Sequence, residues 1–471
     1  MTILSIFESI PKARLLAETT AVLENGVFGT TWQIWVSSIL CILLGALATS
    51  AGIGGGGLFV PLYAFVLGTG VKYGVPVSKA TIFGGSLGKY LSTAFTKHPT
   101  ANRPIVNYNL VAMMQSWELL GTIFGVFFNV LFPELVIVIL LVLVLGFSAY
   151  KTLKKGIQQF KKESNAMKKE IKKSQSTVTL TNDSGSDTAS QSEASQVDEE
   201  TKAPMGDGSV DGEVSGPASS VAPFDVEKDP AISPELQAEL DLEAKLFPKW
   251  NLAVLAVMTV FIIFYSLIKK GIIGEMKGCT AGYWVWYFVP VPFFCLLGAF
   301  VVKMLRAEFR RKQAVGYEYQ DKDLRWDDAT IKKTPLVGFA AGVAASLVGI
   351  GGGMVTGPLF LELGLDPRVS SSTSAFMIVF TGMSSVVQYL SLGYLPVDFA
   401  LWFMAMGFIG AQLGHHSVKK LLERSGRPSL ICFLLGGIIA VSVLIMFING
   451  IVSLASTPAD ELFEFSTKGM C

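Results

Sequence analysis

The sequence predicts an all-α polytopic membrane protein of about 10–12 membrane helices, arranged as two inverted-topology repeats with glycine-broken hairpins. Three observations predict this fold class. The chain has 471 residues, of which 51% are hydrophobic and 16% charged, whereas soluble domains usually carry roughly 25% charged residues. Apolar stretches close to the ~20 residues that cross a bilayer recur along the chain. Two shorter apolar pieces each follow a glycine-rich run, and the two runs share a sequence.

The chain begins with residues 1–32, which we expect to form an amphipathic leader because charged residues interrupt any continuous apolar core. The first repeat is predicted over 33–155. It includes a shorter apolar piece at 57–68, directly after the first glycine run. Its four expected spans cover 34–51, 79–95, 106–131 and 134–154.

A charged insert, 156–248, interrupts the apolar chain and is predicted to be cytoplasmic and largely disordered. From Lys151 to Lys173 there are nine Lys and two Glu, a basic and helix-compatible stretch that leaves the membrane. From Asp183 to Glu243 there are sixteen acids and two Lys among many Ser, Thr, Gly and Pro residues. Such a composition is typical of disorder, because it offers little apolar surface to bury.

After the insert we expect a linking pair of membrane helices over 249–305 and a cytoplasmic loop over 306–333. The second repeat is predicted over 334–452, with a short apolar piece at 354–364, and a tail follows at 453–471. The expected spans of this half are 251–268, 284–304, 335–350, 371–391, 396–415 and 429–450.

Clusters of Lys and Arg predict the orientation, because basic residues near span ends favour the cytoplasmic side. The Lys151–Lys173 stretch and the basic clusters within 303–312 and 419–427 are therefore expected inside. Counting spans from these anchors makes 34–68 begin and end outside and 335–364 begin and end inside. The sequence thus predicts hairpins that enter from opposite faces of the plasma membrane or an endomembrane, with extracytoplasmic N- and C-termini.

The two hairpins are copies of one sequence. Gly52–Tyr63 aligns without a gap on Gly349–Phe360, 297 residues later, and seven positions are identical, including four glycines and one proline. Further matches in a later helix pair Gly121 and Gly125 with Gly410 and Gly414. A repeat whose copies enter the membrane from opposite sides is the architecture of many secondary transporters.

Glycine runs at the turn of an intramembrane hairpin favour an anion site. Glycine lets a ligand approach the main chain, and the helix that follows directs its N-terminal amides at the break. The alternative is that the glycines only permit tight helix packing; two inverted copies favour binding. The candidate binding residues of the runs are Gly54, Gly55, Gly56, Gly57, Gly351, Gly352 and Gly353, and Pro61 and Pro358 are expected to shape the hairpins.

Polar residues inside the spans are further candidates, because each is costly in lipid and usually faces a cavity or a partner helix. Lys89 is expected to hold an anion or to extend toward the cytoplasmic face. Glu118 is expected to relay a proton or to pair with Lys89. The hydroxyls that could complete an anion cage are Thr81, Ser86, Ser372, Thr373, Ser374 and Thr381, although each is also a common helix-packing residue.

Composition argues against other classes of function. The formal net charge of +1 gives no reason to expect a nucleic-acid partner. Five cysteines without CxxC spacing and only three histidines predict neither a metal site nor a cofactor, and no catalytic motif of an enzyme occurs in the spans. The expected partners are the lipid bilayer, a small anion and a coupling proton or ion.

These features together resemble the TauE/SafE sulfite exporter family. The resemblance rests on the glycine-rich hairpins, on Lys97-His98-Pro99, on Leu361–Gly364 with Val369-Ser370, and on the insert after Lys155, and it is strongest to the longer plant and protist members. It implies a secondary transporter, by its name an exporter, for small sulfur-containing anions such as sulfite or organosulfonates. The alternative is a non-transporting endomembrane scaffold that acts through the acidic insert.

Overall fold

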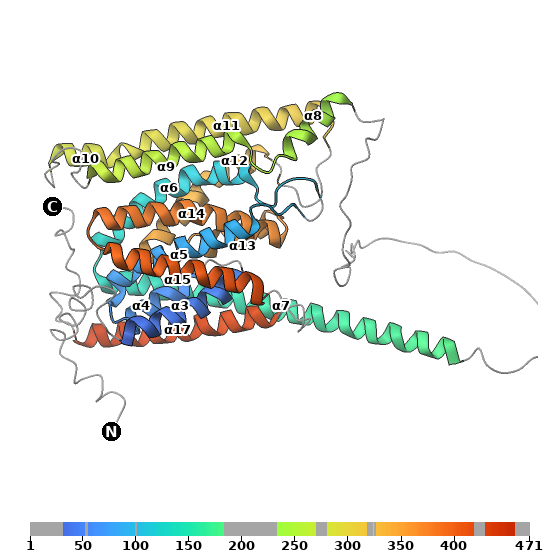
Figure 1. Ribbon diagram of the computed structural model, residues 1–471, viewed down its shortest axis with the longest axis horizontal. Helices are drawn as coiled ribbons and strands as arrows, with labels where there is room; N and C mark the ends of the chain where they lie inside the picture. Colours follow the sequence, from blue (N-terminus) through green and yellow to red (C-terminus); the bar gives the residue numbers. More distant parts are fainter. Residues whose placement is uncertain are drawn as a thin grey trace, which may run out of the picture. The chain divides into compact units, whose positions relative to one another are not determined.

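The computed structural model describes residues 32–51, 55–98, 101–182, 233–269, 280–317, 324, 326–418 and 429–456. The regular elements among these residues are helices (Figure 1). One isolated β-bridge joins Lys97 and Pro104. Eight of the described helices are long and apolar enough to cross a membrane, and two shorter apolar helices accompany them. The prediction of an all-α polytopic membrane protein is therefore confirmed. The predicted leader lies outside the described residues, except for Trp32.

The first half contains five helices, and apolar residues on nearly every face explain why they bury against one another or lipid. Two differ from the expected spans: α5 begins nine residues earlier than predicted, and α7 runs on through the basic stretch after the span. The bounds are α3 Trp32–Ala51, α4 Gly56–Phe65, α5 Gly70–Thr93, α6 Tyr108–Leu131 and α7 Glu134–Asn182.

The linking helices follow as α9 (Lys249–Lys269), α10 (Ala281–Phe288) and α11 (Pro290–Ala314). The expected single span 284–304 is divided at Val289, because Pro290 and Pro292 have no backbone N–H and disfavour a continuous helix. α11 also continues into the segment expected as a loop. Helices α9 and α11 pack on the body of the protein (Figure 1). α9 contacts α6 and α14, and α11 contacts α6.

The second half repeats the order of long and short helices seen in the first. A long helix ends at a glycine, a ten-residue helix follows, and three longer helices complete the half. The bounds are α12 Asp328–Val348, α13 Gly353–Glu362, α14 Pro367–Ser391, α15 Val397–Leu413 with a π-helical end at Gly414–Val418, and α17 Ser429–Ser456. The tail beyond Ser456 lies outside the described residues.

One prediction for the insert is wrong. Its last part forms α8 (Pro234–Glu243), although we expected disorder up to Glu243. Ser233 caps this helix by accepting a hydrogen bond from the Leu236 N–H, Pro234 occupies its first turn, and Glu235 suits the positive helix end. Residues 183–232 of the insert lie outside the described residues.

The matched glycines of the two halves make reciprocal contacts. A Cβ on Gly121 of α6 would lie 2.2 Å from the Phe339 carbonyl oxygen in α12, and a Cβ on Gly410 of α15 would lie 2.9 Å from the Ile42 carbonyl oxygen in α3. Phe339 follows Ile42 by 297 residues (339 − 42), the offset between the two glycine runs. Each half therefore packs its fourth helix against the first helix of the other half.

Candidate functional site

The first glycine break separates α3 from α4. Gly55, at the N-cap of α4, has φ +73°, a left-handed conformation that favours glycine. Gly54 of the predicted site lies outside the described residues. Because α4 begins at Gly56, the first-turn amides of Gly56 and Gly57 are directed toward the break.

The second break separates α12 from α13. Gly349 ends α12 with φ +78°, and Gly351 has φ +54°, so both positions favour glycine. The Ser78 hydroxyl of α5 donates a hydrogen bond of 3.0 Å to the Gly349 carbonyl oxygen. This bond satisfies one exposed acceptor of the unwound backbone and ties it to the first half of the chain.

The start of α4 lies in direct contact with the second break. A Cβ on Gly56 would be 2.2 Å from the carbonyl carbon of Ile350, so the start of α4 touches the main chain of the second break. A Cβ on Gly57 would be 2.7 Å from Met354 Cε, at the start of α13. Glycine is therefore required at position 56 for this approach, and the first turns of both short helices meet at one place. Pro61 lies inside α4 and Pro358 inside α13.

Glu118 of α6 is aimed at the second break. Its side chain is fully buried, and a Cβ on Gly352 would lie 2.2 Å from its Oε1 atom. Neither carboxylate oxygen of Glu118 has a hydrogen-bond partner. A buried carboxylate without hydrogen bonds is costly, so its electrostatic surroundings decide whether it carries charge.

Lys79 supplies those surroundings and was missed by the sequence analysis. It is 1% exposed on α5, and its ammonium charge acts on Glu118. We expected the span to start at residue 79, which would leave Lys79 at a helix end. α5 starts instead at Gly70, which puts Lys79 nine residues, or ~13 Å, along the helix. Extending the helix backward past Pro76 would have revealed it.

Lys89, also on α5, has other neighbours. Its amine donates hydrogen bonds to the Thr49 carbonyl oxygen at 2.9 Å and to the Ser371 hydroxyl. The expected pair between Lys89 and Glu118 is therefore wrong, because neither Glu118 oxygen has a hydrogen-bond partner. Lys89 instead links α3, α5 and α14.

The predicted hydroxyls mostly bond to helix backbone or to one another. Ser86 donates to Phe83 O and Thr381 to Met377 O, as helix hydroxyls often do. Three others make contacts between elements, and Ser372 is buried in α14. These contacts are Thr81 with the Tyr63 hydroxyl at 2.6 Å, Thr373 accepting from Asn107 N at 3.0 Å, and Ser374 accepting from the Thr356 hydroxyl at 3.4 Å.

Gln115 is a further buried polar residue that the sequence analysis did not single out. It lies one turn before Glu118 on the same face of α6, since residues three apart are neighbours on a helix. Its side chain is fully buried, and neither its amide nitrogen nor its amide oxygen has a hydrogen-bond partner. α6 therefore presents two consecutive buried polar groups with unused hydrogen-bonding capacity.

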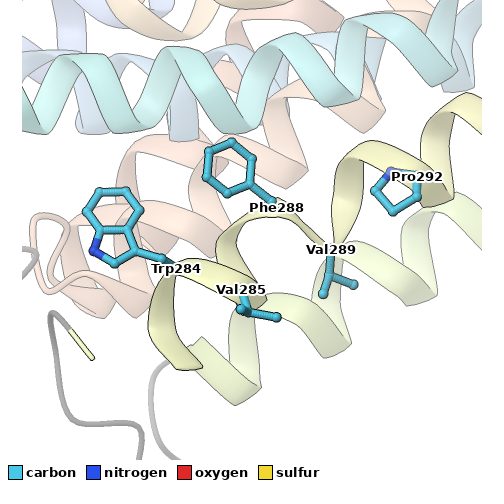
Figure 2. A pocket seen from close by; sticks show the side chains of 5 residues that line it. All are labelled: Trp284, Val285, Phe288, Val289 and Pro292. Carbon is cyan, nitrogen blue, oxygen red and sulfur yellow. The ribbon is translucent and has the colours of Figure 1, made fainter. Parts of the chain in front are cut away.

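A hollow elsewhere on the described surface has a different character. It measures about 560 Å³ and lies at the junction of α10 and α11 (Figure 2). Its lining is apolar, and Trp284, Val285, Phe288, Val289 and Pro292 form it. With neither a cation nor a cluster of N–H donors among these side chains, this hollow does not suit an anion.

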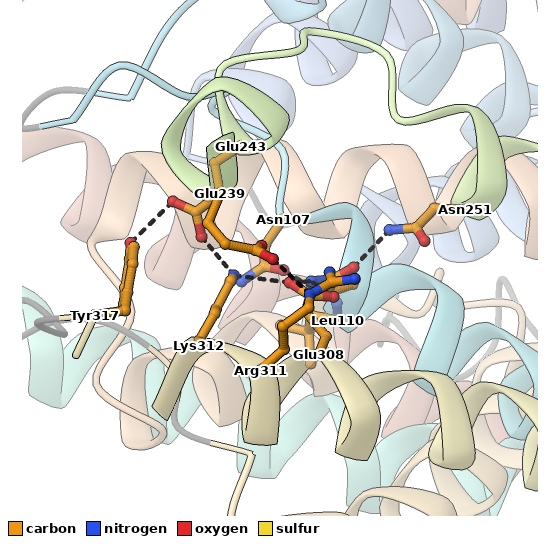
Figure 3. A network of polar contacts seen from close by, with 10 residues as sticks. Asn107, Leu110, Glu239, Glu243, Asn251, Glu308, Arg311, Lys312 and Tyr317 are labelled. Atoms are coloured by element: carbon orange, nitrogen blue, oxygen red, sulfur yellow. Dashed lines mark hydrogen bonds and ion pairs between the residues drawn. The ribbon is translucent and has the colours of Figure 1, made fainter. Parts of the chain in front are cut away.

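A polar network joins the end of the insert to the membrane body (Figure 3). Lys312 of α11 pairs with Glu243 of α8 and with Glu308, and Arg311 pairs with Glu239. The Tyr317 hydroxyl donates to Glu243 at 2.8 Å, and burial followed by the negative charge of Glu243 raises the pKa of Tyr317 above its usual range.

The network continues into the helix that carries Glu118. Glu308 accepts two hydrogen bonds from the Asn109 amide, at 3.0 and 3.1 Å, and Asn109 accepts one from Asn251 of α9 at 2.6 Å. Helices α8, α9 and α11 are therefore all connected to the first turn of α6.

Comparison with known proteins gives a consistent result. Residues 31–181 and 244–443 match the family model described as sulfite exporter TauE/SafE. The chain is 30% identical to sulfite exporter TauE/SafE family protein 3 of Arabidopsis thaliana, over 91% of this chain and 80% of that protein. It is 28% identical to family protein 5 of the same plant, over 88% and 82% of the two chains.

A bacterial relative matches a shorter region. The chain is 33% identical to the probable membrane transporter protein YunE of Bacillus subtilis (strain 168), over 19% of this chain and 35% of that protein. No solved structure matches the chain.

Proposed function

Because this chain belongs to the TauE/SafE sulfite exporter family, we propose that it carries small sulfur-containing anions, such as sulfite or organosulfonates, out of the cytoplasm. The chain is a multi-pass membrane transporter and not an enzyme. The observation that carries the proposal is the direct contact of the start of α4 with the second glycine break. It gives a single place where the first turns of α4 and α13 meet.

The chemistry of this place suits an anion. The amides of Gly56 and Gly57 in α4 and of Gly353 in α13 precede the first hydrogen bonds of their helices, and the helix dipole adds a positive potential there. Glycines at both breaks keep the main chain accessible. Among the predicted residues that the structure describes, Gly55, Gly56, Gly57 and Gly351–Gly353 form the proposed site, and the hydroxyls of Thr373 and Ser374 lie on α14, which packs against α13.

We further propose that the halves 33–155 and 334–452 are inverted repeats that move against each other around the site. The reciprocal packing of α6 on α12 and α15 on α3 supports this, because the matched glycines Gly121 and Gly410 contact the matched residues Phe339 and Ile42 of the other half. The basic clusters favour a cytoplasmic insert and cytoplasmic 306–333 segment, with extracytoplasmic termini.

The proposal is tested by sulfite flux into proteoliposomes of purified protein. Gly55→Val and Gly352→Val should reduce flux to background, since the first forces a β-branched residue to φ +73° and the second displaces the Glu118 carboxylate. Gly146→Val is the matched control, because no atom lies within 4 Å of a Cβ at that position of α7. Unchanged flux in both break variants, with correct membrane insertion, would refute the site.

A further inference from the structure

The buried charges at the second glycine break support a more specific inference, which rests on the proposed anion transport. We propose that Lys79 and Glu118 form an electroneutral loading site, where a monovalent sulfonate binds beside Lys79 together with one proton on Glu118. The inference assigns to Lys79 and Gln115 a role in anion recognition that the glycine breaks alone do not require.

Glu118 lies at the second glycine break, next to the start of α13. Its Oε1 atom faces Gly352 so closely that any side chain at this position would displace the carboxylate, and both of its oxygens lack hydrogen-bond partners. α13 begins at the next residue, Gly353, and runs for ten residues, so its N-terminal amides point toward the same break. A carboxylate at this point competes with a ligand anion for the positive end of the helix.

Glu118 is exposed to the charge of one buried lysine. Lys79 of α5 is the charged group whose field reaches it within the described part of the chain. Helices α9, α11, α12 and α14 also contact α6, and their charged side chains lie toward one end or the other of each helix. These are Lys249 and Lys269, the run from Lys303 to Lys312, Asp328 with Lys332 and Lys333, and Arg368.

Charge balance then defines what the site can accept. With Lys79 protonated and Glu118 ionised, the buried pair sums to zero. A bound monoanion would leave one uncompensated negative charge in a medium of low dielectric, which is strongly unfavourable. A proton taken from water onto Glu118 restores the sum to zero, and its return to water on release of the anion completes the cycle. The proposed stoichiometry is one proton for each monovalent anion.

The hydrogen-bonding groups fit a sulfonate. Its three oxygens are acceptors, and Lys79, the Gln115 amide and the Gly353 amide at the start of α13 are donors. Gln115 and Glu118 lie one turn apart on α6 and have unused hydrogen-bonding atoms. A dianion of the same shape, such as sulfate, would retain one unbalanced charge, so the site should select monoanions.

Lys89 does not take part in this balance. It lies ten residues beyond Lys79 on α5, ~15 Å along the helix, and its amine is already engaged by Thr49 and Ser371.

The test measures binding of methanesulfonate, a monoanion from pH 5.5 to 8.5, to the purified full-length protein by calorimetry. As the pH rises through the range in which Glu118 ionises, the wild-type affinity should fall by up to tenfold per pH unit. Glu118→Gln, which mimics the protonated carboxyl, should bind with a weaker dependence on pH than the wild type. Lys79→Gln should weaken binding at least tenfold, and sulfate should bind the wild type at least tenfold more weakly than methanesulfonate.

The controls are Lys72→Gln and Glu134→Gln, which alter a second lysine and glutamate pair on α5 and α7 away from the breaks. Both should retain the wild-type affinity and pH slope. If Lys79→Gln fails to fold, the double variant with Glu118→Gln removes both buried charges and should bind weakly without a pH slope. A pH slope in Glu118→Gln equal to that of the wild type, or a Lys79→Gln affinity equal to that of the controls, overturns the inference while leaving anion transport intact. Failure of the wild type to bind any sulfonate or sulfite overturns both.

Discussion

Gly56 and Gly57 are adjacent residues with different tolerance for a side chain. A Cβ on Gly56 would meet the Ile350 main chain at 2.2 Å, whereas a Cβ on Gly57 would meet the ends of the Leu145 and Met354 side chains at 2.6 and 2.7 Å. Side-chain ends can rotate away, but the main chain of the second break cannot.

We therefore expect Gly56→Ala to lower the free energy of unfolding by about 2 kcal/mol and Gly57→Ala by less than about 1 kcal/mol. Thermal unfolding of the purified variants in detergent measures this difference. Equal losses in the two variants would mean that the breaks separate more easily than their contact indicates.

The sequence located the glycines and Glu118 but assigned the wrong partner to Glu118. Glycine runs are visible in any single sequence, and an acid inside an apolar stretch is equally plain. The residue that pairs with Glu118 depends on the directions in which side chains point on helices that are not neighbours in sequence. Lys79 and Lys89 lie ten residues apart on one helix and therefore on different faces. A small error in the expected start or rotation of that helix is enough to assign one lysine the neighbours of the other.

Among the helices, α8 provides a test of how the insert is attached. Lys312 is 9% exposed and contacts Glu243 and Glu308, so removing one acid leaves a buried charge less well compensated. Glu243→Gln should lower the protection of α8 amides against hydrogen exchange by about 2 kcal/mol.

The matched control is Arg306→Gln, which breaks an ion pair whose side chains are 45% and 76% exposed. Its effect should stay below about 1 kcal/mol because solvent screens exposed pairs. Similar protection of α8 in both variants would show that α8 is attached by apolar contacts.

Long apolar stretches predict the existence of the membrane helices well, because about 20 consecutive apolar residues are typical of a helix that crosses a bilayer. The ends of these helices are harder to predict from the sequence. α5 starts among polar and small residues, at Gly70, where hydropathy is weak, and the division at Val289 depends on two prolines within an apolar run. The average composition of the whole acidic segment indicates disorder and therefore hides α8. Ser233-Pro234-Glu235 is nevertheless a typical helix start.

At the level of the whole molecule, α8 shows where an insert deletion should stop. Removing 183–232 leaves both α7 and α8 in place, whereas a deletion that reaches 243 also removes Glu239 and Glu243 from the α11 network. A transporter should keep at least about half of its sulfite flux without 183–232, because no part of the proposed site lies there.

A scaffold that acts through the acidic insert should instead lose its cellular phenotype on the same deletion. Flux in proteoliposomes and complementation in cells measure the two outcomes separately. Loss of flux with normal membrane insertion would contradict a purely peripheral role of residues 183–232.

The reciprocal packing of the halves has a consequence for synthesis. α6 ends at Leu131, but α12, the helix that covers its glycines, ends at Val348. At 5–20 residues per second, a ribosome needs roughly 10–40 s to make the intervening chain. During that time the nascent first half has its Gly121 and Glu118 surfaces uncovered in the membrane. Chaperones of membrane insertion should therefore protect α6 until the second half arrives.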